Sequence, residues 1–93
     1  MIQSFKCRET ETIWHGKYSK KFPIEIQKRA LRKLRLLNAS ETLNDLRIPP
    51  SNHLEMLQGN RIGTYSIRIN IKWRICFIWD DSNAVDVEIV DYH

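Results

Sequence analysis

The N-terminal half of the chain shows apolar residues at helical spacing. Between residues 24 and 37 they form one stripe, interrupted at Gln27, that consists of Ile24, Ala30, Leu31, Leu34 and Leu37. Basic residues fill the opposite face, so the segment predicts an amphipathic helix, and Pro23 suits its first position. A second helix is predicted over residues 9–18, with Ile13 and Trp14 on its buried side.

Shorter elements flank these helices. Residues 2–7 alternate between polar and apolar, which predicts a short strand. Ser40 is expected to cap a short turn or helix that runs to Leu46, because its hydroxyl can accept the free amide protons there. Residues 48–52 (Ile-Pro-Pro-Ser-Asn) are not expected to form regular structure, because two prolines remove donors and fix the backbone.

The C-terminal half alternates with a period of two, which is typical of strands. Strands are predicted over 53–57, 64–71, 73–79 and 85–90, with a turn at 59–63 and a hairpin connection at 80–83. On the final strand Val85, Val87 and Ile89 are expected to point inward. The pattern predicts one α+β domain over residues 1–93, in which the helices come first and cover one face of an antiparallel meander.

The two central strands divide apolar from polar side chains. One face is expected to carry Tyr65, Ile67, Ile69, Trp73, Ile75, Phe77 and Trp79, which we interpret as core. The other face carries Ser66, Arg68 and Asn70 on the first strand and Arg74, Cys76 and Ile78 on the second. Whether Arg74 lies on the same face as Arg68 depends on how the strands pair, which the sequence leaves open.

Composition excludes several classes of protein. With 93 residues and 42% apolar residues, the chain fits one small folded unit. Cys7 and Cys76 lie far apart and lack a C-x-x-C spacing, so we expect neither a disulfide scaffold nor a zinc site, and a cytoplasmic location. No apolar run near the N-terminus is long enough for a signal peptide or a membrane span, so no membrane association is expected.

The net charge of +4 is unevenly distributed. Residues 17–35 contain one acid, Glu25, against the bases Lys17, Lys20, Lys21, Lys28, Arg29, Arg32, Lys33 and Arg35. The acids gather later, at Asp80, Asp81, Asp86, Glu88 and Asp91. The basic segment is either a solvated helix face or a surface for a nucleic acid or an acidic protein, and both readings stay open.

Arg68 and Arg74 are candidates for phosphate chemistry. A guanidinium matches phosphate oxygens two at a time and stays charged at any working pH. Two such groups would stabilise the extra negative charge of a pentavalent transition state. The alternative is that each arginine pairs with a carboxylate across the sheet, at Asp86, Glu88 or Asp91.

Residues near the C-terminus add proton-transfer groups. His93 could act as an acid or a base, and Tyr92 adds a second hydrogen-bonding group. Glu55 could act as a carboxylate base, although an ion pair with Arg61 or Arg74 is favoured.

The remaining motifs add little. His15 is interpreted as a surface residue, and His53 as a weak candidate for RNA contact. The chain has no phosphate-binding glycine loop and no metal-spaced His/Cys cluster, so no cofactor and no metal are expected.

Several stretches together resemble the HigB group of RelE-like toxins. They are Asn52-His-Leu-Glu-Met-Leu-Gln-Gly-Asn-Arg61, Gly63-Thr-Tyr-Ser-Ile-Arg68, Trp73-Arg-Ile-Cys-Phe77 and Val87-Glu-Ile-Val-Asp-Tyr-His93. The group's usual Gly-Asp-Arg is Gly59-Asn60-Arg61 here. The resemblance implies a fold similar to a microbial ribonuclease, with an N-terminal helical pair on a twisted antiparallel sheet. It also implies the toxin of a type II toxin–antitoxin system, which cuts messenger RNA in the ribosomal decoding site without a metal.

The same resemblance implies residue roles and partners. The ribose 2′-hydroxyl would attack the phosphodiester, and Arg68 and Arg74 would contact the scissile phosphate. Tyr92 and His93 would orient groups or move protons. Glu55 falls where relatives vary in residue type, including a histidine in some. Contact with the 70S ribosome and messenger RNA would fall to Lys20, Lys21, Lys28, Arg29, Arg32, Lys33, Arg35 and Asn70. The expected protein partner is a helix-turn-helix antitoxin (HigA-like), through which operator DNA would be reached only indirectly. The alternatives are a non-catalytic co-repressor that binds the antitoxin and a ribosome-independent ribonuclease.

Overall fold

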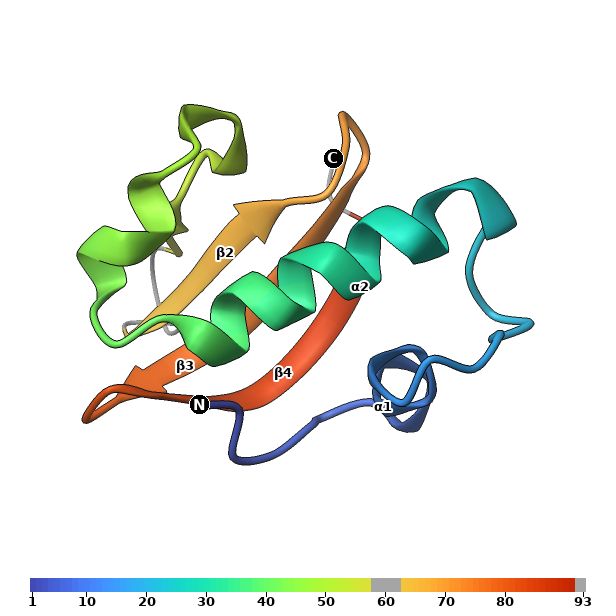
Figure 1. The fold of residues 1–93 in the computed structure, drawn as a ribbon, viewed down its shortest axis with the longest axis horizontal. Coiled ribbons are helices and arrows are strands. Elements are labelled where there is room, and N and C mark those ends of the chain that lie inside the picture. Colours follow the sequence, from blue (N-terminus) through green and yellow to red (C-terminus); the bar gives the residue numbers. More distant parts are fainter. Residues whose placement is uncertain (58–62, 92–93) are drawn as a thin grey trace.

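The computed structural model describes residues 1–57 and 63–91 (Figure 1). In chain order the elements are α1 (Arg8–Trp14), α2 (Ile24–Ala39), the 3-10 helices η1 (Leu43–Arg47) and η2 (Pro50–Asn52), and the strands β1 (Glu55–Met56), β2 (Thr64–Arg68), β3 (Trp73–Asp80) and β4 (Asn83–Asp91). The strands form one antiparallel sheet in the order β1-β2-β3-β4. The predicted α+β arrangement, with helices on an antiparallel meander, is therefore confirmed.

Helix α2 lies across one face of the sheet and supplies much of the core (Figure 1). Its buried residues are Ile26, Ala30, Leu34 and Leu37, and they share a cluster with Ile67, Ile75 and Phe77 of the sheet. Each large aliphatic or aromatic side chain buried in this way contributes about 1.5–3 kcal/mol. The helix predicted over 24–37 is confirmed, with Pro23 as the residue before the first turn. The inward position of Ile24 is wrong, because the sheet lies under Ile26 and Ile24 is 71% exposed.

Helix α1 is shorter than predicted. It ends at Trp14 because Gly16 turns the chain with a φ of 79°, a left-handed conformation that glycine adopts readily. The buried Thr10 fixes this helix to β4, where its Oγ1 accepts a hydrogen bond from the Ile89 amide at 2.9 Å. The strand predicted at residues 2–7 is reduced to two isolated parallel bridges, which join Ile2 and Phe5 to β4.

The segment after α2 differs from the sequence-based expectation. Ser40 donates its hydroxyl to the Leu36 carbonyl, and Thr42 caps η1 instead, in a reciprocal capping box with Asp45. The backbone amides of Glu41 and Thr42 lower the pKa of the Asp45 carboxyl. This carboxylate therefore stabilises the fold above its unfolded-state pKa, and the effect is lost as the pH falls through the lower folded-state value.

The segment predicted to be irregular, residues 48–52, contains a short helix. Residues 50–52 are regular after all, because Pro50 begins the short helix η2. The turn predicted at 59–63 lies, except for Gly63, outside the described residues. Within residues 1–57 and 63–91, no helix has both the length and the apolar character that a bilayer span requires.

Two strands are shorter than predicted, and the pairing of β3 with β4 contains one shift. Strand β1 has two residues of the five predicted at 53–57, and β2 ends at Arg68, before a turn over residues 69–72. The predicted connection at 80–83 is a two-residue turn, with positive φ at Asp81 and Ser82. Partner residues shift between Cys76 and Ile78, opposite the part of β4 that contains Asp86.

Asp86 has a φ of 53° and interrupts the alternation of β4. As a result Ala84 is buried together with Val87 and Ile89, and the predicted inward position of Val85 is wrong.

We expect Asp86→Val to lower the free energy of unfolding by about 1–2 kcal/mol, because a β-branched residue tolerates the left-handed backbone poorly. Asp86→Gly should keep or raise stability. Urea denaturation would measure both, with Asp80→Val at the exposed end of β3 as the control. Equal stability of Asp86→Val and Asp86→Gly would contradict the importance of the left-handed backbone at Asp86.

Candidate functional site

The strand pairing decides the side on which Arg74 lies. Arg68 and Arg74 are directly opposite each other in the β2–β3 ladder, and Ser66 is opposite Glu55 of β1. Directly paired residues point to the same side of a sheet, so all four residues share one face. It is the face turned away from α2, because Ile67 and Ile75, with the opposite parity, pack into the helical core.

Arg74 is buried in this face, with 7% of its surface exposed. Its Nε donates to the Ser66 hydroxyl at 2.8 Å, and its Nη2 donates to the backbone carbonyl of His53. Its Nη1 lies 4.0 Å from a carboxylate oxygen of Glu55, which confirms the predicted ion pair between these two residues. Arg74 therefore connects β3 to the chain segment that runs from η2 into β1.

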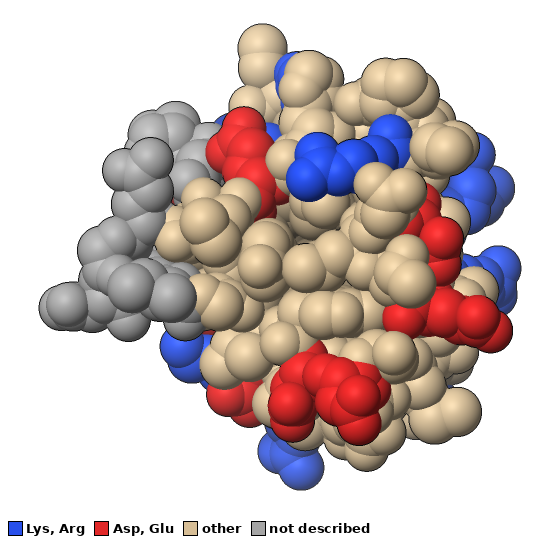
Figure 2. All heavy atoms as spheres, turned by 90° about the vertical axis from the view of Figure 1, so that its left-hand side faces the viewer, with Lys and Arg blue, Asp and Glu red and all other residues tan. Residues whose placement is uncertain are grey.

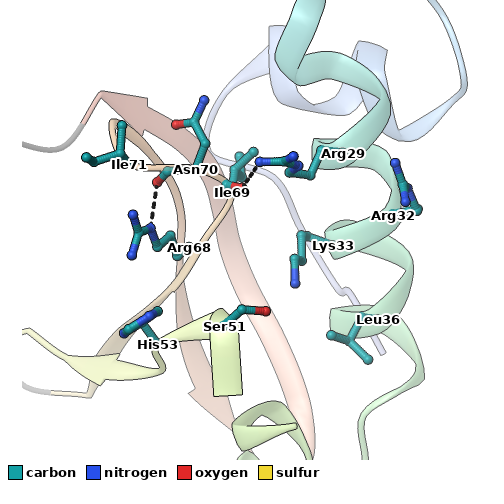
Figure 3. Close-up of a pocket in the computed structure, with 10 residues that line it drawn as sticks. All are labelled: Arg29, Arg32, Lys33, Leu36, Ser51, His53, Arg68, Ile69, Asn70 and Ile71. Atoms are coloured by element: carbon teal, nitrogen blue, oxygen red, sulfur yellow. Dashed lines mark hydrogen bonds between the residues drawn. The ribbon is translucent and has the colours of Figure 1, made fainter. Parts of the chain in front are cut away.

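A hollow of about 690 Å³ opens at the edge of β2 beyond the last residue paired with β1 (Figure 3). Its lining residues are Arg29, Arg32, Lys33, Leu36, Ser51, His53, Arg68, Ile69, Asn70 and Ile71. Helix α2 forms one wall, and Arg68 and His53 lie on the other side (Figure 3). Four of these residues are cationic and none is acidic, so this basic hollow attracts anions.

Hydrogen bonds fix the rim of the basic hollow. The Nε of Arg68 donates to the Asn70 carbonyl at 3.1 Å, and Arg29 donates to the Ile69 carbonyl at 3.3 Å (Figure 3). The Asn70 side-chain oxygen accepts from the amides of Lys72 and Trp73, so this side chain closes the turn after β2. Among the described residues, Arg68 has no hydrogen bond to its two Nη atoms.

Lys33 is held in the opposite wall by the buried Asn52. The Lys33 ammonium donates to the Asn52 side-chain oxygen, and the Asn52 amide donates to the carbonyls of Leu46 and Ile48 at 3.1 and 3.3 Å. Partial burial, followed by the charges of Arg29 and Arg32, lowers the pKa of Lys33. The cations of this wall therefore repel one another, and an anion bound between them would relieve that repulsion.

The sequence-predicted site residues fall into distinct places. Arg29, Arg32, Lys33, Arg68 and Asn70 line the basic hollow, whereas Arg74 and Glu55 pair with each other on the sheet face of Arg68 and do not line it. The other predicted RNA contacts lie elsewhere: Lys28 borders a second hollow, Lys20 and Lys21 belong to the loop before α2, and Arg35 is exposed on α2. Tyr92 and His93 lie outside the described residues.

His53 is more prominent than the sequence indicated. It follows η2 with a left-handed φ of 44°, and its side chain lines the basic hollow on the side of Arg68 (Figure 3). The only signal in the sequence is its position directly after the diproline loop. No group of three or more His, Cys, Asp or Glu residues in the described ranges could hold a metal ion.

Charge is unevenly distributed over the molecule. Figure 2 shows the left-hand side of Figure 1, where acidic and basic groups both border a broad uncharged centre. Glu88 and Asp91 form ion pairs with Lys6 and Lys72 at 3.4 and 3.6 Å. Arg74 has an ion pair with Glu55, which is not one of the three carboxylates expected as its partners, while Arg68 has no carboxylate within ion-pair distance among the described residues.

Fold and site together define a class of protein: a small basic α+β protein with a cationic, acid-free hollow at a sheet edge. Comparison with known proteins specifies the class further. A family model for the RelE-like toxin of type II toxin–antitoxin system HigB matches residues 3–93. The toxin HigB-1 of Vibrio cholerae is 38% identical over 87 residues, which cover 92% of each chain. The chain therefore belongs to the HigB-like family of RelE-like toxins of type II toxin–antitoxin systems.

Other known proteins share the sequence or the fold of this chain. An uncharacterized protein of Haemophilus influenzae is 39% identical over 79 residues, which cover 85% of this chain and 77% of that one. Among solved structures, YafQ from Escherichia coli has a TM-score of 0.60 at 12% identity and covers 94% of this chain and 89% of its own. The YoeB–YefM complex from Staphylococcus aureus has a TM-score of 0.59 at 21% identity and covers 100% and 95%. At such identities these structures show the shared fold alone.

Replacement of Asn52 should loosen the wall of the basic hollow. We expect Asn52→Ala to lower the free energy of unfolding by about 2–4 kcal/mol, because two backbone carbonyls lose their donor in a buried site. Asn44→Ala, at an exposed position of η1, should change it by less than about 0.5 kcal/mol. Urea denaturation of both variants measures the difference, and equal stabilities would contradict the role assigned to Asn52.

Proposed function

We propose that this chain is a ribosome-dependent endonuclease that cleaves messenger RNA at the basic hollow. The carrying observation is that Arg68 faces an acid-free hollow with three further cations on α2, while Arg74 lies on the same sheet face. The family to which the chain belongs consists generally of endoribonucleases that cleave messenger RNA. A phosphodiester placed in this hollow would reduce the repulsion between the cations of α2.

The proposed reaction is attack by the ribose 2′-hydroxyl on the neighbouring phosphorus, which forms a cyclic phosphate and releases a 5′-hydroxyl. The transition state carries extra negative charge on the equatorial oxygens, and no metal takes part. The two Nη atoms of Arg68 are suited to donate to these oxygens. Arg74 lies beside Arg68 on the same sheet face and adds its charge to the field. It positions His53 through a hydrogen bond to the backbone carbonyl and Glu55 through an ion pair.

Proton transfer requires a base at the 2′-hydroxyl and an acid at the leaving 5′-oxygen. We assign these roles to three residues. His93 and Tyr92 are indicated by the family resemblance, and the side chain of His53 lines the basic hollow. Glu55 is a positioning residue in this scheme, because its carboxylate is directed at Arg74.

The ribosome is proposed to supply the substrate in a defined conformation. The basic hollow has room for few nucleotides, so a second macromolecule is needed to hold the RNA. The exposed cations Lys20, Lys21, Lys28, Arg32 and Arg35 are suited to phosphates of ribosomal RNA, in contacts that weaken with salt. Arg29 and Lys33 donate hydrogen bonds to the Ile69 carbonyl and the Asn52 side chain, so they fix the shape of the basic hollow and also contribute positive charge.

A protein antitoxin is the partner that membership of this family implies. We propose that it carries a helix-turn-helix domain (HigA-like) and that operator DNA is contacted through it. The cytoplasm is the proposed location, because ribosome and messenger RNA meet there.

Arg68→Ala should abolish cleavage while the fold persists. We expect a loss of about 100-fold or more in the cleavage rate, because a charge-assisted contact to the transition state disappears. Arg68→Lys should recover only part of it, since an ammonium cannot form the two-pronged contact. The measurement is primer extension on a defined messenger RNA in a translating extract.

The matched control is Arg47→Ala, at an exposed position of η1 that does not line the basic hollow. It should cleave and poison growth as the wild type does. Full activity of Arg68→Ala would refute the assignment of the site. Cleavage of naked RNA without ribosomes would refute ribosome dependence, and an intact wild-type protein that binds the antitoxin but never cleaves would identify a co-repressor.

The exposed cations of α2 should govern ribosome affinity and its salt dependence. For Arg32→Gln with Arg35→Gln, we expect the slope of log affinity against log salt concentration to fall by roughly one to two, because each lost phosphate contact releases about one counterion fewer. Sedimentation with ribosomes at several salt concentrations measures it. The pair Arg8→Gln with Arg47→Gln removes equal charge elsewhere, and an equal change of slope in both pairs would contradict a specific docking face.

A further inference from the structure

A second hollow, of about 390 Å³, lies on the other side of α2 and has no part in the proposed chemistry. It is lined by Ile13, Gly16, Lys17, Tyr18, Ile24, Glu25, Gln27, Lys28 and Leu31. None of these residues lines the basic hollow. We call it the apolar hollow, because its lining surface is mainly apolar and includes Ile13, Tyr18, Ile24 and Leu31.

Part of the apolar stripe of α2 lies outside the core and borders the apolar hollow. Ile26, Ala30 and Leu34 fill the core, whereas Ile24 is 71% exposed. Tyr18 is 60% exposed beside it. Ile13 is buried, so it forms a floor below these two exposed side chains. A contiguous apolar surface of this kind is a common mark of an interaction site.

Hydrogen bonds hold the wall of the apolar hollow in place before any ligand arrives. The Gln27 side chain donates to the carbonyls of Ser19 and Phe22 at 2.7 and 2.8 Å and accepts from the Ser19 amide at 3.0 Å. The buried Ser19 hydroxyl donates to Glu9 of α1 at 2.6 Å. The loop that carries Tyr18 is therefore fixed to both helices, so a partner has little ordering entropy to overcome.

Charge around the apolar hollow selects among occupants. Lys17 and Lys28 line it against a single acid, Glu25, and Lys20 and Lys21 follow in the adjoining loop. The whole chain has a net charge of +4, so a second copy would meet like charge. The complementary occupant is an apolar side chain flanked by aspartate or glutamate.

We propose that the apolar hollow is the docking site for an acidic, apolar-anchored segment of the antitoxin. The inference rests on the antitoxin partner of the proposed function and not on the cleavage chemistry. A large aliphatic or aromatic side chain of that segment enters between Tyr18 and Ile24, above Ile13. Carboxylates on either side of it pair with Lys17 and Lys28.

Ile24→Asp tests the docking site. Ile24 is the first residue of α2, where an acidic side chain favours the helix dipole, so the variant should fold. Titration calorimetry with the purified antitoxin should show a loss of affinity of about tenfold or more, the size expected for removal of a central anchor. Ile48→Asp is the matched control, because Ile48 is equally 71% exposed and lies outside the hollow.

Two further variants address the pocket wall and its charge. Tyr18→Ala and Lys28→Glu should each weaken antitoxin binding. If thermal unfolding shows that Ile24→Asp is misfolded, these two variants test the docking site in its place. Antitoxin affinity within about twofold of wild type for these variants would overturn the proposal. Equal losses in Ile24→Asp and Ile48→Asp would also overturn it.

Other occupants give distinct results that also overturn the proposal. Sedimentation would reveal a wild-type dimer that Ile24→Asp dissociates while antitoxin binding persists. Flotation with anionic phosphatidylserine vesicles would reveal membrane binding with the same dependence on Ile24. Because binding is measured without ribosomes, a wild-type chain that fails to cleave messenger RNA would refute the proposed chemistry and leave this test standing.

Discussion

One buried guanidinium organises the candidate site. Arg74 lies in the sheet face turned away from the helices, where an unpartnered charge would cost several kcal/mol. Its partners are the Ser66 hydroxyl, the His53 carbonyl and the Glu55 carboxylate. These contacts hold the segment from η2 to β1 against β2, and that segment forms one side of the basic hollow. The position of His53 relative to Arg68 thus depends on the buried charge of Arg74, which is the cross-strand partner of Arg68 and donates to the His53 carbonyl.

Helix α2 presents three different surfaces. One row of side chains fills the core, a second row carries Arg29, Arg32 and Lys33 into the basic hollow, and a third row exposes Ile24 and Leu31 in the apolar hollow. Two of its cations are anchored, Arg29 to a turn carbonyl and Lys33 to Asn52. A single helix can therefore couple core packing, anion attraction and partner binding, because its period places successive residues on different faces.

Long, regular patterns predicted the elements well. The helix at 24–39 and the strand at 73–80 follow from their periodicity, since each packs a row of side chains against the core. Predictions failed where one backbone conformation interrupts the pattern, as at Gly16 after α1 and at Asp86 in β4. They also failed where a hydroxyl had two possible partners, as at Ser40, which bonds back to α2 while Thr42 provides the cap.

The sequence by itself determined the fold class, the basic character of α2 and, through family resemblance, the kind of protein. The sequence also identified Arg68 and Arg74 as candidates, because the chemistry of a side chain follows from its residue type. Only the tertiary structure decided that these arginines share a face, since strand register is set by pairing between distant segments. It also divided the cations of residues 17–35 among two hollows and an open surface, brought His53 to the site and left Ile24 exposed. Which face of α2 meets the sheet is a property of packing, and the apolar stripe alone is too wide to specify it.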